Sequence, residues 1–111
     1  MKVSQKELVL LPYPFSDLEH TKVRPGLVVS NDSFNKNSAD CIMVPLTTVL
    51  KEEPYSVMIN QEDLYSGKLL KSSRVRADKL FTVEKELIVM KIGVIKEKTF
   101  ERVKSEIFKV F

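Results

Sequence analysis

The chain of 111 residues has no tryptophan, no pair of cysteines and no long apolar run. Its lone cysteine, Cys41, cannot form an intramolecular disulfide, and its place in an apolar segment indicates a buried side chain in a reducing compartment. With one histidine, His20, the chain also lacks the ligands of a His/Cys metal site. No apolar run approaches the ~20 residues that cross a bilayer, and the N-terminus has no signal-peptide pattern. We therefore expect a cytoplasmic protein that uses no cofactor and no membrane.

What the chain does contain is the composition of a globular protein, with 43% hydrophobic and 30% charged residues. This length corresponds to one domain, here residues 1–111, which can bury a core without disulfides or metal. The net charge of +3 is weak evidence for an anionic partner. The distribution of charge is more informative, because residues 67–79 hold five lysines or arginines and only one acid.

Short apolar runs separated by turn residues predict a mainly β chain. The expected strands are residues 8–11, 23–30, 40–48, 55–59 and 69–78, and a further apolar run at 87–94 is a candidate strand. Residues 31–38 are polar and typical of a connection between the second and third strands.

The C-terminal segment has a different period. Apolar side chains recur there at intervals of three and four residues: Phe100, Val103, Ile107 and Phe111. This pattern predicts an amphipathic helix that covers one end of the β-core and begins either after a Thr99 cap or at Lys96. Strands followed by one helix indicate an antiparallel α+β arrangement or a small barrel.

The entrance of the second expected strand carries a notable charge. Pro25 fixes its own φ and biases Arg24 toward an extended conformation, which presents the guanidinium beside the polar loop 16–22. Thr47 and Thr48 end the next apolar strand with hydroxyls that could lie near this arginine. A guanidinium that keeps its proton suits an anionic ligand. The plainer alternative is a surface arginine whose stem packs on the core.

The densest positive stretch is a second candidate site. Four side chains fall on one face of a strand with a period of two, and a lysine follows them: Ser72, Arg74, Arg76, Asp78 and Lys79. This face is either a phosphate track with one carboxylate in it or a solvated surface whose Arg76–Asp78 pair contributes little to stability. Close to a hydroxyl, Asp78 would be able to act as a general base.

Four blocks of the sequence resemble the MazF/PemK family of ribonuclease toxins from toxin–antitoxin systems. They are residues 14–32, 44–47, 67–70 and 75–83, which read PFSDLEHTKVRPGLVVSND, VPLT, GKLL and VRADKLFTV. An Arg-Pro pair alone would mean little, whereas four blocks in order and at matching spacing are a specific signal. The likeness extends from about residue 8 to the C-terminus, nearly the whole chain.

The resemblance implies an SH3-like antiparallel β-barrel with a C-terminal α-helix, the CcdB/MazF-type fold. It also implies a metal-independent endoribonuclease that cuts single-stranded RNA through attack of the 2′-OH, leaving a 2′,3′-cyclic or 3′-phosphate and a 5′-hydroxyl end. Specificity for a few unpaired bases is expected. The family further implies a homodimer and a cognate antitoxin whose extended acidic segment occupies the RNA groove.

The resemblance assigns roles to both candidate sites. Arg24 would clamp the scissile phosphate and stabilise the charge that develops on it. Through the VPLT block, the family's catalytic threonine corresponds to Thr47, with Thr48 as the neighbouring alternative. Some members carry an arginine and an aspartate at the positions of Arg76 and Asp78, in acid–base or electrostatic roles, and other members lack the arginine.

The expected RNA contacts come from the loop before Arg24 and from the basic stretch: Phe15, Glu19, His20, Lys22, Ser72, Arg74 and Lys79. Glu19 coincides with a loop acid often seen in the family, and His20 lies one position from a functional loop histidine of one branch. A solvated loop residue is the plainer interpretation of His20, although general acid work is open to it. Phe15 either stacks on an unpaired base or packs on the core, and we favour packing on the core.

The sequence departs from the family pattern in two places. Lys6-Glu7 stands where the first strand usually has glycine followed by an acid, and Phe81 replaces a basic residue. Neither touches the expected chemistry. Three other interpretations remain open: a CcdB-like poison of DNA gyrase, a non-catalytic RNA-binding module of the same fold, and a structural or interaction domain.

Overall fold

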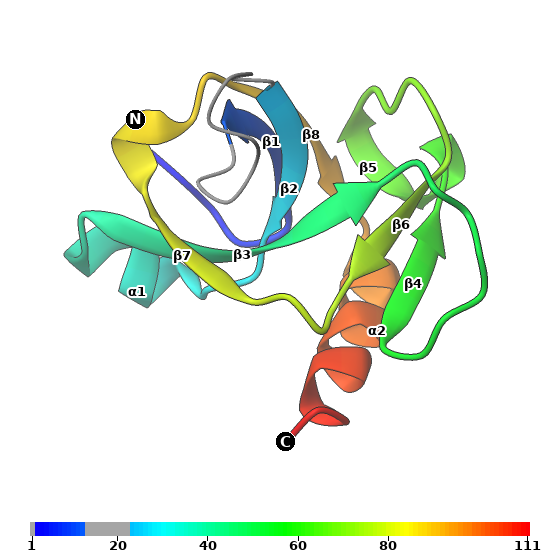
Figure 1. The fold of residues 1–111 in the computed structure, drawn as a ribbon. Coiled ribbons are helices and arrows are strands. Elements are labelled where there is room, and N and C mark those ends of the chain that lie inside the picture. The colour runs from blue at the N-terminus through cyan, green and yellow to red at the C-terminus, as the bar shows by residue number, and fades with distance from the viewer. Residues whose placement is uncertain (1, 13–22) are drawn as a thin grey trace.

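The computed structural model describes residues 2–12 and 23–111 (Figure 1). The strands in this part are β1 (Glu7–Pro12), β2 (Val23–Val28), β3 (Asp40–Thr47), β4 (Ser56–Ile59), β5 (Leu64–Gly67), β6 (Ser73–Arg76), β7 (Phe81–Glu84) and β8 (Met90–Ile95). The helices are α1 (Asp32–Asn37) and α2 (Glu97–Phe108), with two short 3₁₀ helices, η1 (Gln61–Asp63) and η2 (Lys85–Leu87).

The strands form one antiparallel sheet that curls on itself (Figure 1). Its order is β4-β6-β3-β2-β1-β8-β5, and β7 pairs with the first half of β3. β3 changes partner along its length, from β7 at Asp40–Met43 to β6 at Leu46 and Thr47. Pro45, which has no amide hydrogen to donate, lies between these two stretches. This mainly β architecture with a C-terminal helix confirms the fold class expected from the sequence.

Alternating side chains give the sheet two different faces. The helix face packs against α2, where aliphatic side chains from β1 to β8 surround Phe100, Val103 and Ile107 of the helix. The opposite face carries a second buried cluster, made of Val3, Val9, Leu11, Val28, Cys41, Met43, Val83 and Ile88. The second cluster fills only part of that face, since polar side chains of β2, β3 and β6 occupy the rest.

Cys41 lies inside the second cluster and is fully buried, as its apolar segment predicted. Burial raises the pKa of its thiol to about 11. The thiol is therefore protonated at neutral pH and behaves as a small apolar side chain rather than as a nucleophile.

The polar connection expected at 31–38 is wrong in part, because it contains α1. The side chain of Asn31 accepts a hydrogen bond from the backbone N–H of Phe34 at 2.8 Å. Asn35 is buried and donates to the carbonyl of Ser30 at 2.9 Å. Polar capping rather than an apolar stripe stabilises this short helix, which is why its sequence has the pattern of a loop.

Several expected strands have different bounds in the structure. The strand expected at 69–78 is only Ser73–Arg76, and the one expected to begin at 87 begins at Met90, after η2. Two strands of four residues, β5 and β7, were not expected. Each of them buries a single side chain, so their sequences lack the clear alternation that identifies a strand.

The C-terminal helix begins at Glu97 with Lys96 at its N-cap, which confirms one of the two expected starts. Thr99 is not the cap. It is buried in the first turn, where its hydroxyl donates to Oδ1 of Asp63 at 3.1 Å and ties α2 to η1. Neither α-helix of the described residues is long and apolar enough to cross a membrane.

Candidate active site

Three neighbouring strands, β2, β3 and β6, carry Arg24, Thr47 and Arg74 on the face of the sheet opposite α2. Gly26 of β2 pairs with Pro45 of β3. This pair is the last one of the β2–β3 ladder, and Arg24 and Thr47 each lie two residues beyond it on their strands. On the other side of β3, Thr47 pairs directly with Arg74. Residues directly opposed in an antiparallel sheet point to the same face, so Thr47 and Arg74 share one face. Arg24 lies on that face too, because its partner Leu11 belongs to the second buried cluster. These three residues form a polar row over β2, β3 and β6.

Arg24 is the exposed member of this row. It is the second residue of β2 and pairs with Leu11 of β1. The chain becomes buried only from Gly26 onward. Among residues 2–12 and 23–111, no acceptor or carboxylate contacts the Arg24 guanidinium. A permanently charged fork of N–H donors in this state can clamp a phosphate in a bidentate manner.

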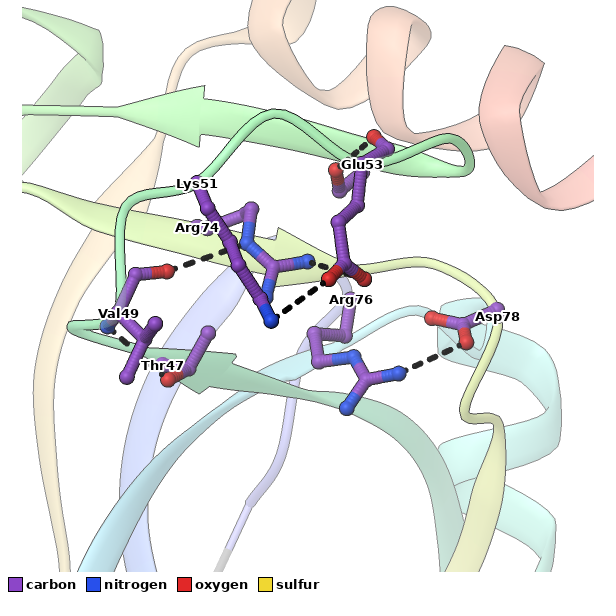
Figure 2. A network of polar contacts seen from close by, with 8 residues as sticks. Thr47, Val49, Lys51, Glu53, Arg74, Arg76 and Asp78 are labelled. Atoms are coloured by element: carbon purple, nitrogen blue, oxygen red, sulfur yellow. Dashed lines mark hydrogen bonds and ion pairs between the residues drawn. The ribbon is translucent and has the colours of Figure 1, made fainter.

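Thr47 ends β3 with its side chain half-buried. Its hydroxyl oxygen accepts a hydrogen bond from the backbone N–H of Val49 at 3.1 Å (Figure 2). A hydroxyl that accepts from the backbone still has its own hydrogen to donate. Thr48 lines a cavity together with Leu10 and Pro25 on the helix face. The arrangement therefore favours Thr47 over Thr48 as the threonine on the side of Arg24.

Arg76 and Asp78 form an ion pair near the same row. Arg76 ends β6, and its Nη2 donates to Oδ2 of Asp78 at 3.0 Å (Figure 2). Among the described residues, Oδ1 of this carboxylate has no hydrogen-bond or ion-pair partner. Nε of Arg76 is buried and has no acceptor within the part of the chain that the structure describes. A carboxylate next to an arginine with an unused donor has the groups needed for acid–base chemistry on a phosphate.

Arg74 differs from the exposed phosphate contact that its sequence pattern indicated. Its side chain is 4% exposed. Nε donates to the carbonyl of Val49 at 3.2 Å, and Nη1 lies 3.9 Å from Oε2 of Glu53 (Figure 2). Glu53 also pairs with Lys51 at 3.2 Å. These contacts hold the segment that joins β3 to β4 against the sheet, beside Thr47.

The expected face of four polar residues does not form, because Ser72 and Asp78 lie outside β6. Ser72 and Lys79 are exposed at the two ends of this strand. The remaining candidates, Phe15, Glu19, His20 and Lys22, lie outside the described residues. Within the described ranges, no three His, Cys, Asp or Glu side chains are grouped so as to hold a metal ion.

Sequence reasoning missed Lys51 and Glu53 as parts of the site's surroundings. Their only sequence signal was the turn pattern that ends in Pro54. Glu53 meets Arg74 from a position 21 residues away, across the β3–β4 connection, and neither periodicity nor local spacing reports such a contact.

The family model of PemK-like, MazF-like toxins of type II toxin–antitoxin systems matches residues 4–111. The chain belongs to this family. No curated protein sequence matches the chain.

Members of the family with solved structures share the fold. A mycobacterial endoribonuclease in complex with its cognate antitoxin is 22% identical, with a TM-score of 0.78 over 96% of this chain and 92% of that chain. MazF from Deinococcus radiodurans is 20% identical, with a TM-score of 0.78 over 99% and 96%. The Mycobacterium tuberculosis toxin MazF-mt6 is 17% identical, with a TM-score of 0.76 over 95% of each chain.

Proposed function

We propose that this member of the family is a sequence-specific, metal-independent endoribonuclease that cuts single-stranded RNA. The observation that carries the proposal is the exposed Arg24, which lies on the same face of the sheet as Thr47 and has no partner among the described residues. Support comes from the family match and from the similar structures that are named endoribonucleases. Phosphate is the ligand that such a guanidinium and hydroxyl suit best.

In the proposed reaction, the 2′-OH of one nucleotide attacks the adjacent phosphorus, and the bond from phosphorus to the 5′ oxygen breaks. Asp78 takes the 2′-OH proton on Oδ1, since Oδ2 already accepts from Arg76. Arg24 and the Thr47 hydroxyl donate to the phosphate oxygens, on which negative charge grows in the transition state. The leaving 5′ oxygen takes up one proton from water, and the proton held by Asp78 returns to the solvent. The products are a 2′,3′-cyclic phosphate, which water can open to a 3′-phosphate, and a 5′-hydroxyl.

The partners proposed with this activity are single-stranded RNA, a second copy of the chain and a cognate antitoxin, all in the cytoplasm. The antitoxin proposal rests on the family and on similar structures solved as complexes, including MazE–MazF from Deinococcus radiodurans. An acidic, extended antitoxin segment would compete with RNA for Arg24, because both carry negative charge.

Two alternatives use the same fold without cleavage. A CcdB-like poison of DNA gyrase would make Arg24 and Thr47 irrelevant to activity. A non-catalytic RNA-binding module would use Arg24 for affinity only. The match to the PemK-like, MazF-like family weighs against the gyrase alternative, and cleavage itself separates the proposed enzyme from the binding module.

The test is incubation of the purified protein with a long single-stranded RNA in EDTA, with mapping of the product ends. We expect discrete cuts with 5′-hydroxyl ends, their loss in Arg24→Ala, and no cutting of DNA of the same sequence, which lacks the 2′-OH. Binding without cleavage would favour the RNA-binding module. If the protein neither binds nor cuts RNA, inhibition of DNA gyrase is the next activity to assay. Equal cutting by Arg24→Ala would contradict the assignment of Arg24.

A further inference from the structure

A cavity of about 270 Å³ opens at the same strand ends, on the helix face of the sheet. Leu10, Pro25, Leu69 and Ile92 are its apolar lining. Leu10 and Pro25 are direct partners across β1 and β2. Leu69 and Ile92 pack against the apolar core that α2 covers. The cavity is therefore an open end of that core, which no side chain of the described residues fills.

This cavity lies on the reverse side of the candidate active site. Arg24 and Thr47 belong to the polar row, and the residues that follow them, Pro25 and Thr48, line the cavity. Successive residues of a strand point to opposite faces. Only the start of β2 and the end of β3 therefore separate the two places. An unpaired RNA strand can pass over such strand ends, because its bases can be splayed away from the backbone.

The loop that forms one wall of the cavity is held in place without a ligand. Gly67 has φ +88°, and a Cβ there would lie 2.2 Å from the carbonyl oxygen of Ile92, so only glycine fits this close approach. Lys68 N–H donates to the same carbonyl at 3.0 Å. The side-chain amide of Gln61 donates to the Gly67 carbonyl at 3.1 Å and accepts from the N–H of Leu69 at 2.8 Å.

The chemistry of the lining indicates which ligand fits. Lys68 and Lys71 line the cavity, and the described lining residues include no acid. Leu70 also lines it, with 85% of its surface exposed to water. The volume lies just below the ~300–1,000 Å³ of sites for drug-sized ligands, which suits one flat, apolar group. Apolar walls with two cations nearby match a nucleobase attached to phosphate.

We propose that this cavity binds the base of a nucleotide next to the scissile phosphate and so contributes to RNA sequence specificity. The proposal rests on the proposed function for the position of the phosphate at Arg24. The base enters between Pro25 and Leu69, and Lys68 and Lys71 contact the phosphate of the neighbouring nucleotide. Leu70 then covers the bound base and loses contact with water.

The first test needs no cleavage. Methyl NMR signals of Leu69, Leu70 and Ile92 are followed during titration with the four nucleoside 5′-monophosphates and, as a control without a base, ribose 5-phosphate. We expect saturable shifts with at least one nucleotide and none with ribose 5-phosphate. Leu70→Asp should abolish the shifts, since it places a carboxylate at the cavity. Tyr65→Asp, which adds the same charge at a side chain that is 79% exposed on β5, should retain them.

The second test joins the cavity to the cleaved phosphate. The affinities of three RNAs are compared, each made uncleavable by a 2′-O-methyl group at the cleavage position. One RNA has all its bases, and the other two have an abasic residue immediately 5′ or immediately 3′ of that position. One abasic position should weaken binding to the wild type about 10-fold, the order expected for one stacked base. It should weaken binding to Leu70→Asp less than about 2-fold, because the two changes remove the same contact. Tyr65→Asp should show the wild-type loss.

The outcomes separate the two proposals. RNA cleavage without base-dependent shifts, or equal abasic losses in wild type and Leu70→Asp, would overturn the base site and leave the endoribonuclease intact. Base-dependent shifts in a protein that cuts no RNA would retain a nucleotide site and overturn the proposed reaction.

Discussion

Arg24 and Arg74 lie on either side of Thr47 on one face of the sheet, and their surroundings differ. Arg24 stands at the start of β2, exposed and without a partner among the described residues. Arg74 stands inside β6, 4% exposed, with its guanidinium held by Val49 and Glu53. The segment that joins β3 to β4 contacts Arg74 (Figure 2). The buried guanidinium of Arg74 is thus tied to the fold through Val49 and Glu53, whereas the guanidinium of Arg24 is available to a ligand.

The difference shows that a dense run of basic residues is not in itself a phosphate track. In residues 67–79 the sequence places five cations, yet the most central of them is a buried part of the structure. A charge taken out of water must be paired and hydrogen-bonded, and Arg74 meets that condition with a carbonyl and a carboxylate. Substitutions at the two arginines should therefore affect different properties of the protein.

The largest effect is expected for Arg24→Ala. Loss of a donor to the transition-state phosphate should lower kcat/KM for RNA about 10²–10³-fold. The free energy of unfolding should change by less than about 0.5 kcal/mol, because the side chain is exposed. Arg24→Lys keeps the charge but loses the planar fork, so its kcat/KM should fall between those of the wild type and Arg24→Ala. A stability loss as large as that of an Arg74 variant would remove the distinction between the two arginines.

Arg74→Met should instead lower the free energy of unfolding by about 2 kcal/mol, measured by urea denaturation. It leaves the Val49 carbonyl without its donor and the Glu53 carboxylate with Lys51 alone, while methionine fills most of the space. Arg102→Met removes an arginine whose side chain is 57% exposed on α2, and should cost well under 1 kcal/mol. Equal losses in the two variants would mean that the buried contacts of Arg74 contribute nothing.

Thr47, between the two arginines, offers a sharper test of which side the substrate uses. Thr47→Val keeps the shape of the side chain but removes the hydroxyl, and should lower kcat about 10-fold if one hydrogen bond to a charged phosphate is lost. Thr47→Ser keeps the hydroxyl and its acceptance from Val49, and should stay near the wild-type rate. Similar rates for the valine and serine variants would exclude a direct role for this hydroxyl.

The smallest effect is expected for Glu53→Gln. Its carboxylate is partly exposed, and the contact with Arg74 is long at 3.9 Å. Arg74 keeps its hydrogen bond to Val49, so the loss of stability should be below about 1 kcal/mol and should shrink further in high salt. Unfolding measured at low and at high ionic strength checks this. A loss as large as that of Arg74→Met would assign the stabilisation to the ion pair rather than to the Val49 bond.

The fold was predictable where the sequence has a clear apolar run, as in β1 and β3, or a helical apolar period, as in α2. It was also predictable at Pro25, whose backbone restriction places Arg24 at a strand entrance. It was not predictable in β5, β7 and α1, which pair or cap through contacts that their own sequences do not show. The position of Arg24 relative to Thr47 depends on how β2 and β3 pair. The pairing partner of the buried Arg74 is Glu53, which comes from a distant segment of the chain. Such contacts exist only in three dimensions.

The most direct measurement combines single-turnover RNA cleavage with urea unfolding on the same preparations of wild type, Arg24→Ala and Arg74→Met, at a temperature where all three are folded. We predict that Arg24→Ala keeps the wild-type unfolding midpoint and loses cleavage. Arg74→Met should lose stability and retain more cleavage than Arg24→Ala. Full cleavage by Arg24→Ala, or a stable Arg74→Met that no longer cleaves, would contradict the account.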